Sequence, residues 1–128
     1  MGKLTLDLGV PVIVVAGNHD SPIRLSYMSG VMGQVGLHVV GPVGAEPTGV
    51  PITTKDGTTT TFWLLAYTDP ETARCELANP DIPSHEAALG AQIDLIRPRM
   101  DPEHYHVIVG HAFVTGSTVS ESERPLSV

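Results

Sequence analysis

The sequence has one cysteine, few basic residues and no long apolar run, and each shortage excludes a class of protein. Because Cys75 is alone, an internal disulfide and a cysteine-cluster metal site are excluded. Seven Lys and Arg against fourteen Asp and Glu leave a net charge of −7. The chain alone should bind DNA poorly, because nucleic-acid affinity depends on basic residues that neutralise phosphates. No apolar run approaches the roughly 20 residues of a membrane span, and the first residues lack the apolar stretch of a secretory signal, so we expect a cytoplasmic protein with no membrane partner.

Aromatic residues are also sparse, at 5%, whereas thirteen glycines and eleven prolines predict many turns and short elements. At 128 residues the chain is long enough for one domain, or a piece of one, with a modest core. We expect that domain to cover residues 1–115. Residues 116–128 are polar, offer nothing to a core, and are expected to form a mobile tail.

The first half of the sequence predicts a strand, a helix and a second strand. Residues 4–9 resemble the tail of a helix that ends at a glycine. Residues 12–16 are all apolar without alternation, which predicts a strand buried on both faces. Ser21 followed by a proline predicts the cap and first position of a helix that ends at a later glycine. Residues 37–40 predict a short strand.

The second half predicts a hairpin, a helix and a last strand. Residues 41–52 are rich in glycine and proline and are expected to be loop, and the Asp-Gly pair at 56–57 predicts a hairpin whose second strand, ending at residue 66, enters the core. Residues 71–83 show no clear periodicity. Ser84 predicts the cap of a helix, and residues 105–109 predict a further core strand. The helix has one expected buried face, made of Leu89, Ile93, Ile96 and Met100. The order of elements indicates an α/β or α+β fold.

Three side chains capable of metal or acid–base chemistry follow the first buried strand, in the tetrapeptide Gly-Asn-His-Asp. Open α/β sheets place active sites at this end of a strand. Asn18 offers a neutral amide oxygen to a cation, or is simply a turn residue. His19 is a candidate proton donor or charge stabiliser. Asp20 would hold the His19 imidazole in one tautomer, or would cap the helix that follows.

His111 is the second candidate metal ligand, because it follows Gly110 at the end of another predicted core strand. The four remaining histidines are expected to have surface or packing roles, since none follows a buried strand in this way. They are His38, His85, His104 and His106. Cys75 has no neighbouring histidine to activate its thiol, so a nucleophilic role is not expected.

With these motifs in view, the chain resembles the SbcD-type exonuclease subunit, a member of the calcineurin-like metallophosphoesterase superfamily and the bacterial counterpart of the double-strand-break repair nuclease. The resemblance lies in residues 9–22, the Tyr-Thr-Asp-Pro segment at 67–70, residues 110–114 and the tail from 116 to 128. It implies an α/β fold, as part of an αββα sandwich in which mixed sheets are flanked by helices.

The resemblance also implies an activity. Members of this family are two-metal phosphodiesterases, usually with Mn²⁺, that degrade DNA in repair and recombination together with an SMC-like ATPase subunit of the SbcC type. Asn18 and His111 would bind the second metal. His19 would contact the scissile phosphate and help protonate the leaving group, and Asp20 would orient His19.

Other parts of the family pattern are missing. The sequence contains no Asp-x-His motif, no Gly-Asp motif for the bridging carboxylate and no Gly-His-x-His motif. Two ligands cannot hold two cations, because each hard cation takes about six donors, so the alternative that this chain binds no metal stays open. We therefore expect a central fragment of the nuclease domain, inactive alone and prone to self-association through exposed strand edges. The alternatives are another metallophosphoesterase, acting as a small phosphodiesterase or phosphatase, and a non-catalytic α/β interaction module.

Overall fold

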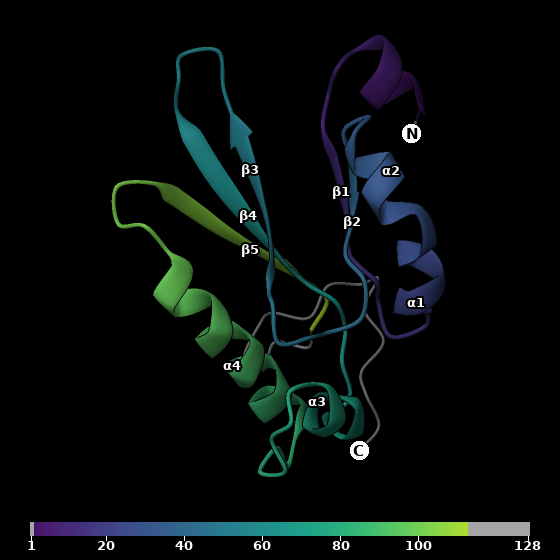
Figure 1. The fold of residues 1–128 in the computed structure, drawn as a ribbon, viewed down its shortest axis with the longest axis vertical. Helices are drawn as coiled ribbons and strands as arrows, with labels where there is room; N and C mark the ends of the chain where they lie inside the picture. Colours follow the sequence, from purple (N-terminus) through teal and green to yellow (C-terminus); the bar gives the residue numbers. More distant parts are fainter. Residues whose placement is uncertain (1, 113–128) are drawn as a thin grey trace, which may run out of the picture.

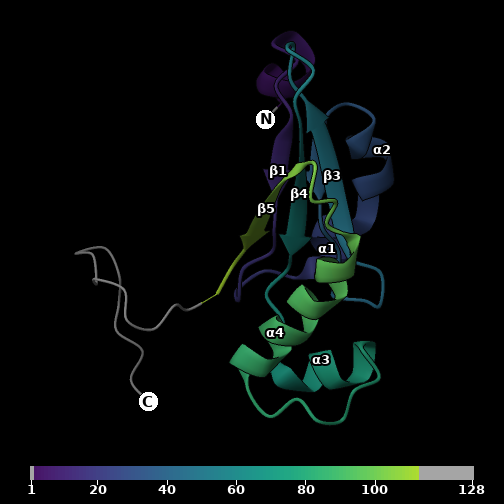
Figure 2. The ribbon, with the colours of Figure 1, turned by 90° about the vertical axis from the view of Figure 1, so that its left-hand side faces the viewer.

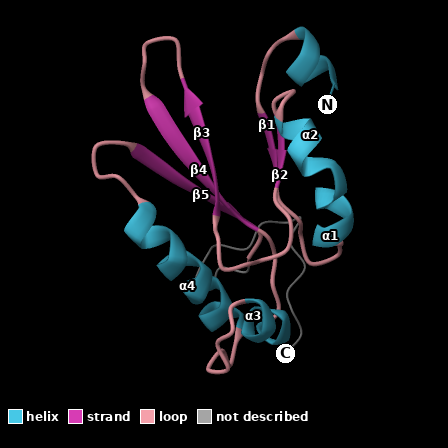
Figure 3. Cartoon of the chain, viewed as in Figure 1, coloured by secondary structure: helices cyan, strands magenta, loops and turns pink. Residues whose placement is uncertain are grey.

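The computed structural model describes residues 2–112, which form two small sheets with helices on their outer sides (Figure 1, Figure 3). This is the broad α/β class that the sequence predicts. In chain order the elements are η1 (Lys3–Asp7), β1 (Val12–Val14), α1 (Pro22–Leu25), η2 (Ser26–Met28), α2 (Ser29–Gly33), β2 (Leu37–Val39), β3 (Thr48–Thr53), β4 (Thr59–Leu65), α3 (Pro70–Glu76), α4 (His85–Ile96), η3 (Arg97–Arg99) and β5 (Tyr105–Gly110).

Two crossover connections set the direction of the strands. β1 pairs in parallel with β2, and α1, η2 and α2 form the connection between them. β4 pairs in parallel with β5, and α3 and α4 form that connection, while β3 pairs antiparallel with β4 through the predicted hairpin. Parallel strands require such long crossovers. In Figure 1, β1, β4 and β5 all run downward and end near the middle of the view, above α3, where the two sheets converge.

A buried apolar cluster joins the two sheets. Its buried members come from the end of β1, the end of β2, from β3 and from β4; they are Ala16, Val40, Val50, Leu64 and Ala66. Residues of β1, β3, β4 and β5 that are partly buried pack around them. The facing sides of the two sheets therefore share one core.

The opposite face of β4 packs against α4. Trp63 and Leu65 are buried there together with Ile96, because successive side chains of a strand point to opposite faces. Leu89, Ile93 and Met100 complete this cluster, so the predicted buried face of the helix is confirmed. Ser84 caps α4 as predicted, since its hydroxyl accepts a hydrogen bond from the Ala87 N–H at 3.2 Å. Seen from the side, α3 lies below the end of β4 (Figure 2).

Two predictions about the strands of the first sheet and the hairpin are wrong. The strand predicted to be buried on both faces is only half-buried, and it ends at Val14, because within residues 2–112 it pairs with β2 alone. The segment predicted as loop, residues 41–52, contains all of β3 (Thr48–Thr53) except its last residue. Pro51 lies within β3, which is possible because β3 is an edge strand whose proline does not interrupt a second ladder.

Two further elements differ from the predictions. The segment without periodicity contains α3, which Asp69 caps and Pro70 begins. Proline at a first helical position after a capping Asp is the signal that a periodicity criterion does not detect. β5 is an edge strand with exposed side chains along most of its length, and not the predicted core strand, because the sheet order β3-β4-β5 leaves one of its sides unpaired in the part of the chain described.

The predicted polar tail at 116–128 lies outside the described residues. Within residues 2–112, no helix is both long enough and apolar enough to cross a membrane.

Candidate functional site

The ends of β1, β4 and β5 meet at one place, which we call the strand-end cluster. It consists of Gly17, Asp20, Tyr67, His85 and His111. The Tyr67 N–H, just beyond β4, donates to the Ala16 carbonyl beyond β1 at 3.0 Å. The ring of His111, just beyond β5, approaches Gly17: its Nδ1 and Cε1 lie 3.4 Å from the place that a Cβ on Gly17 would occupy. Fold topology therefore brings the two sequence motifs together.

The Gly-Asn-His-Asp turn is closed by its own aspartate. Oδ2 of Asp20 accepts a hydrogen bond from the Gly17 N–H at 2.9 Å, and the Asp20 N–H donates to the Gly17 carbonyl at 3.2 Å. The helix cap is Ser21, whose hydroxyl accepts from the Arg24 N–H at 3.4 Å. The carboxylate of Asp20 thus fixes the turn through Gly17; its recorded hydrogen bond goes neither to the helix end nor to the His19 ring.

Asn18 and His19 lie at the tip of this turn, and both side chains are exposed. Asp20 and His111 also remain open to solvent, although both reach Gly17. The structure therefore brings Asp20 and His111 to the same glycine. Asn18 and His19 lie at the exposed tip of the turn that Asp20 closes.

Two members of the strand-end cluster were not predicted as functional residues. The Tyr67 hydroxyl and Nε2 of His85 are 2.8 Å apart, and the Tyr67 ring also stands edge-on to the ring of His111 at a centroid distance of 6.1 Å. In the sequence, Tyr67 belongs to the Tyr-Thr-Asp-Pro segment of the family resemblance, and His85 was expected to have a surface or packing role. The available signal was the position of Tyr67 directly after a buried strand, the same position that made His111 a candidate.

The backbone around Tyr67 is fixed by its polar neighbours. The Thr68 hydroxyl donates to the Ala66 carbonyl at 3.0 Å, and the Asp69 carboxylate accepts from the Glu71 and Thr72 N–H groups at 3.0 Å each. The backbone N–H and the hydroxyl of Thr72 lower the pKa of Asp69 below its ordinary value, because they stabilise the charged carboxylate. Tyr67 is thus held between an ordered strand and an ordered helix start.

The described residues do not fit a two-cation centre by themselves. Within residues 2–112, no group of three or more His, Cys, Asp or Glu side chains is arranged to hold a metal ion. One carboxylate oxygen of Asp20 accepts the hydrogen bond from the Gly17 N–H. The metal ligands that the motifs suggest are therefore Asn18 and His111. A hard cation takes about six donors, so further ligands would have to come from outside this set.

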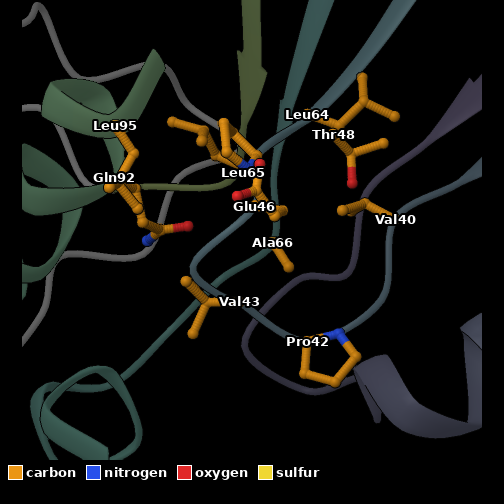
Figure 4. Close-up of a pocket in the computed structure, with 12 residues that line it drawn as sticks. Val40, Pro42, Val43, Glu46, Thr48, Leu64, Leu65, Ala66, Gln92 and Leu95 are labelled. Atoms are coloured by element: carbon orange, nitrogen blue, oxygen red, sulfur yellow. The ribbon is translucent and has the colours of Figure 1, made fainter. Parts of the chain in front are cut away.

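A small cavity, separate from the strand-end cluster, lies between the end of β4, the loop after β2 and α4 (Figure 4). Its volume is about 20 Å³, roughly the space of one water molecule. Val40, Ala66 and Gln92 are among its lining residues, whereas the predicted site residues are not. The strand-end cluster is therefore a surface feature, separate from this cavity.

The sequence matches no model of a known protein family. A functional assignment for this chain therefore depends on its own motifs and on the geometry of the strand ends.

Proposed function

We propose that this chain supplies one part of a two-metal phosphodiesterase site of the SbcD exonuclease type, and that it is catalytically incomplete on its own. The observation that carries the proposal is the position of His111 against Gly17. Two motifs at opposite ends of the chain, each of the residue types that a metallophosphoesterase requires, lie at the same place. Chance proximity of two such motifs at the ends of two strands is a weaker explanation than a shared site.

The arrangement of layers also supports the proposal. Two sheets share a core on their facing sides, α4 covers the outer face of one, and α1 and α2 lie on the outer side of the other (Figure 1). A metallophosphoesterase αββα sandwich has the same order of layers. In the proposed assignment this chain is a central piece of that sandwich.

Each predicted site residue has a role in this proposal. Asn18 and His111 contribute an amide oxygen and an imidazole to the binding of a divalent cation, with Mn²⁺ as the proposed metal. The remaining ligands come from outside the described residues. His19 contacts the phosphate and helps protonate the leaving oxygen. Asp20 orients His19 by closing the turn through Gly17, since its carboxylate bonds to the backbone there.

The proposed partners are DNA and an SMC-like ATPase, acting on the complete nuclease. With a net charge of −7, this chain has no basic excess to hold DNA by itself. The proposal therefore assigns most DNA contacts to regions and partners other than these residues.

The test is Mn²⁺-dependent hydrolysis of bis-p-nitrophenyl phosphate by the purified chain, His19→Ala and His104→Ala. His104 is a matched control, because it is an exposed histidine at the opposite end of β5. We expect no turnover above buffer from any of the three. Turnover that His19→Ala abolishes and His104→Ala retains would show that the site is complete and that the chain is not a partial enzyme.

A second experiment tests the partial metal site directly. We expect paramagnetic Mn²⁺ to broaden the amide resonances of the Gly17 turn and of His111 in NMR spectra, and His111→Ala to abolish the effect. Broadening spread evenly over the acidic surface, unchanged by His111→Ala, would count against any phosphoesterase assignment.

One observation favours the alternative of a non-catalytic interaction module. Ile23, Tyr27 and Val31 follow a four-residue spacing along α1, η2 and α2, and these residues are 70%, 88% and 61% exposed. Exposed apolar stripes of this kind mark interaction surfaces. The hypothesis of an interaction module predicts no localised broadening of resonances by Mn²⁺, so the same NMR experiment separates the two functions. A phosphatase or small phosphodiesterase remains the alternative within the enzyme class.

A further inference from the structure

Tyr67 connects the ends of four elements of the fold. Tyr67 itself follows β4, and its N–H donates to the carbonyl of Ala16, which follows β1. Its hydroxyl contacts His85, the first residue of α4, and its ring stands edge-on to His111, which follows β5. Because the buried Thr68 follows it and is itself bonded to Ala66, the backbone of Tyr67 has little freedom. The orientation of its ring then depends mainly on the hydroxyl contact.

His85 supplies that contact, at 2.8 Å from its Nε2 to the Tyr67 hydroxyl. His85 is itself fixed, because it is the first residue of α4 and directly follows the capping Ser84. His85 is exposed and Tyr67 is half-buried, and a hydrogen bond that is open to solvent contributes little to folding stability. The contact therefore does more to orient the Tyr67 ring than to stabilise the fold.

We propose that Tyr67 and His85 are positioning residues for His111. His85 holds the Tyr67 ring, and the ring limits the orientations that the His111 imidazole can adopt beside Gly17. The T-shaped contact at 6.1 Å is within the range in which an aromatic edge and face attract each other. This inference rests on the proposed function of His111 as a site residue. It adds Tyr67 and His85 to the site as residues that bind neither metal nor phosphate.

Orientation of His111 requires such support because the residue follows a strand that is largely exposed. Among the described residues β5 has a neighbouring strand on one side only, and His111 is itself solvent-exposed. A ligating or substrate-contacting side chain must be held by neighbours that fix its rotamer. In the described part of the chain, the neighbours recorded for the His111 ring are Gly17, which has no side chain, and Tyr67.

The experiment compares Tyr67→Phe, His85→Ala and His85→Gln, with Tyr27→Phe as the matched control for loss of a tyrosine hydroxyl. Tyr27 is 88% exposed and lies in η2, and it is not a member of the strand-end cluster. The readouts, at one fixed pH and without metal or substrate, are the chemical shift of the His111 Cε1–H group and the relaxation-derived order of that carbon. We expect Tyr67→Phe and His85→Ala to shift the resonance and lower its order. His85→Gln should restore both values, because a glutamine amide can still bond to the Tyr67 hydroxyl.

A merely structural role would give a different pattern. General loosening would also change the amide resonances of β5 and lower the melting temperature, whereas we expect both to match those of Tyr27→Phe. Unchanged His111 resonances in Tyr67→Phe and His85→Ala would overturn the proposal. If Tyr67→Phe fails to fold, His85→Ala still provides the test, since that side chain is exposed. Because the readout uses neither Mn²⁺ nor a phosphodiester, a failure here is distinct from a failure of the proposed function.

Discussion

The indole N–H of Trp63 donates a hydrogen bond to Nδ1 of His106 at 3.2 Å, and so joins β4 to β5 across the sheet. An indole N–H only donates, so Nδ1 of His106 must be the accepting nitrogen. Nε2 of His106 lies 2.9 Å from the Asp101 carbonyl, which only accepts. Both contacts are therefore satisfied only by the neutral ring with its proton on Nε2. The histidine that the sequence placed among surface and packing residues is a packing residue that links two strands and a loop.

This pairing fixes the tautomer of His106. We expect ¹⁵N chemical shifts of the ring at neutral pH to report a protonated Nε2 and an unprotonated Nδ1. In Trp63→Phe the donor is absent, and the ring should move toward a mixture of tautomers. His104, exposed on the preceding turn, is the internal reference. A protonated Nδ1 in the unmodified chain would contradict the assignment.

Gly49 is required by the Trp63 ring. A Cβ at this position would lie 2.8 Å from Cζ3 of the buried indole, closer than real contacts allow. We expect Gly49→Ala to lower the free energy of unfolding by about 1–3 kcal/mol, as overpacked cores do. Gly90→Ala is the control, because outside its own helix backbone no atom of the described residues lies within 4 Å of a Cβ there. That change within α4 should stabilise by about 0.5–1 kcal/mol. Urea denaturation measures both, and equal effects of the same sign would disprove the packing argument.

Asp69 should make the stability of the chain depend on pH. Its carboxylate caps α3, and the Thr72 backbone N–H and hydroxyl lower its pKa below the ordinary value of 3.8. A group whose pKa is lower in the folded state stabilises the fold at pH values above its unfolded-state pKa. This contribution is lost as the pH falls through the folded-state pKa. We expect Asp69→Asn, which keeps a capping oxygen but no charge, to melt below the parent chain at neutral pH.

The difference between Asp69→Asn and the parent should shrink as the pH falls below about 4. Asp69→Ala removes the cap as well and should cost about 1 kcal/mol. Asp81→Asn, an exposed aspartate outside the helices, is the control for loss of one charge. A melting-temperature difference that stays constant from neutral pH to pH 3 would show that the charge of Asp69 has no role.

Asp20 should act on the backbone of its turn. Its Oδ2 accepts from the Gly17 N–H at 2.9 Å, so Asp20→Ala should raise the hydrogen-exchange rate of the Gly17 amide by several-fold or more. Asp20→Asn keeps an acceptor and should preserve most of the protection. If exchange at Gly17 is the same in all three proteins, the carboxylate does not close the turn, and a direct contact with His19 becomes the better explanation.

β5 should mediate self-association. Within residues 2–112 it is an edge strand, and its exposed apolar residues include Val107, which is 40% exposed. Unpaired edges with apolar side chains pair with other copies, and a lysine on such an edge prevents it. We expect the mass measured by light scattering to rise with protein concentration, and Val107→Lys to suppress this rise. Thr58→Lys, in the exposed hairpin turn, is the control. A monodisperse monomer at all concentrations would refute the prediction.

Local signals in the sequence predicted many of the elements. Ser84 and the spacing of Leu89, Ile93 and Ile96 specified both the start and the buried face of α4, because capping and helical periodicity involve residues close in sequence. The Asp-Gly pair specified the hairpin for the same reason. By contrast, the predicted burial of β1 and β5 was wrong, since burial depends on how many neighbours a strand has in the sheet, and apolar composition does not report that number.

For the site, the sequence by itself determined which chemical groups are present and that they follow strands. It selected Asn18, His19, Asp20 and His111 on those grounds. The tertiary structure alone shows that the ends of β1, β4 and β5 meet, that the Tyr67 ring stands beside His111, and that His85 reaches the Tyr67 hydroxyl. The physical reason is that parallel pairing through crossovers brings distant residues to one edge of the fold, and such contacts leave no pattern in the neighbouring sequence.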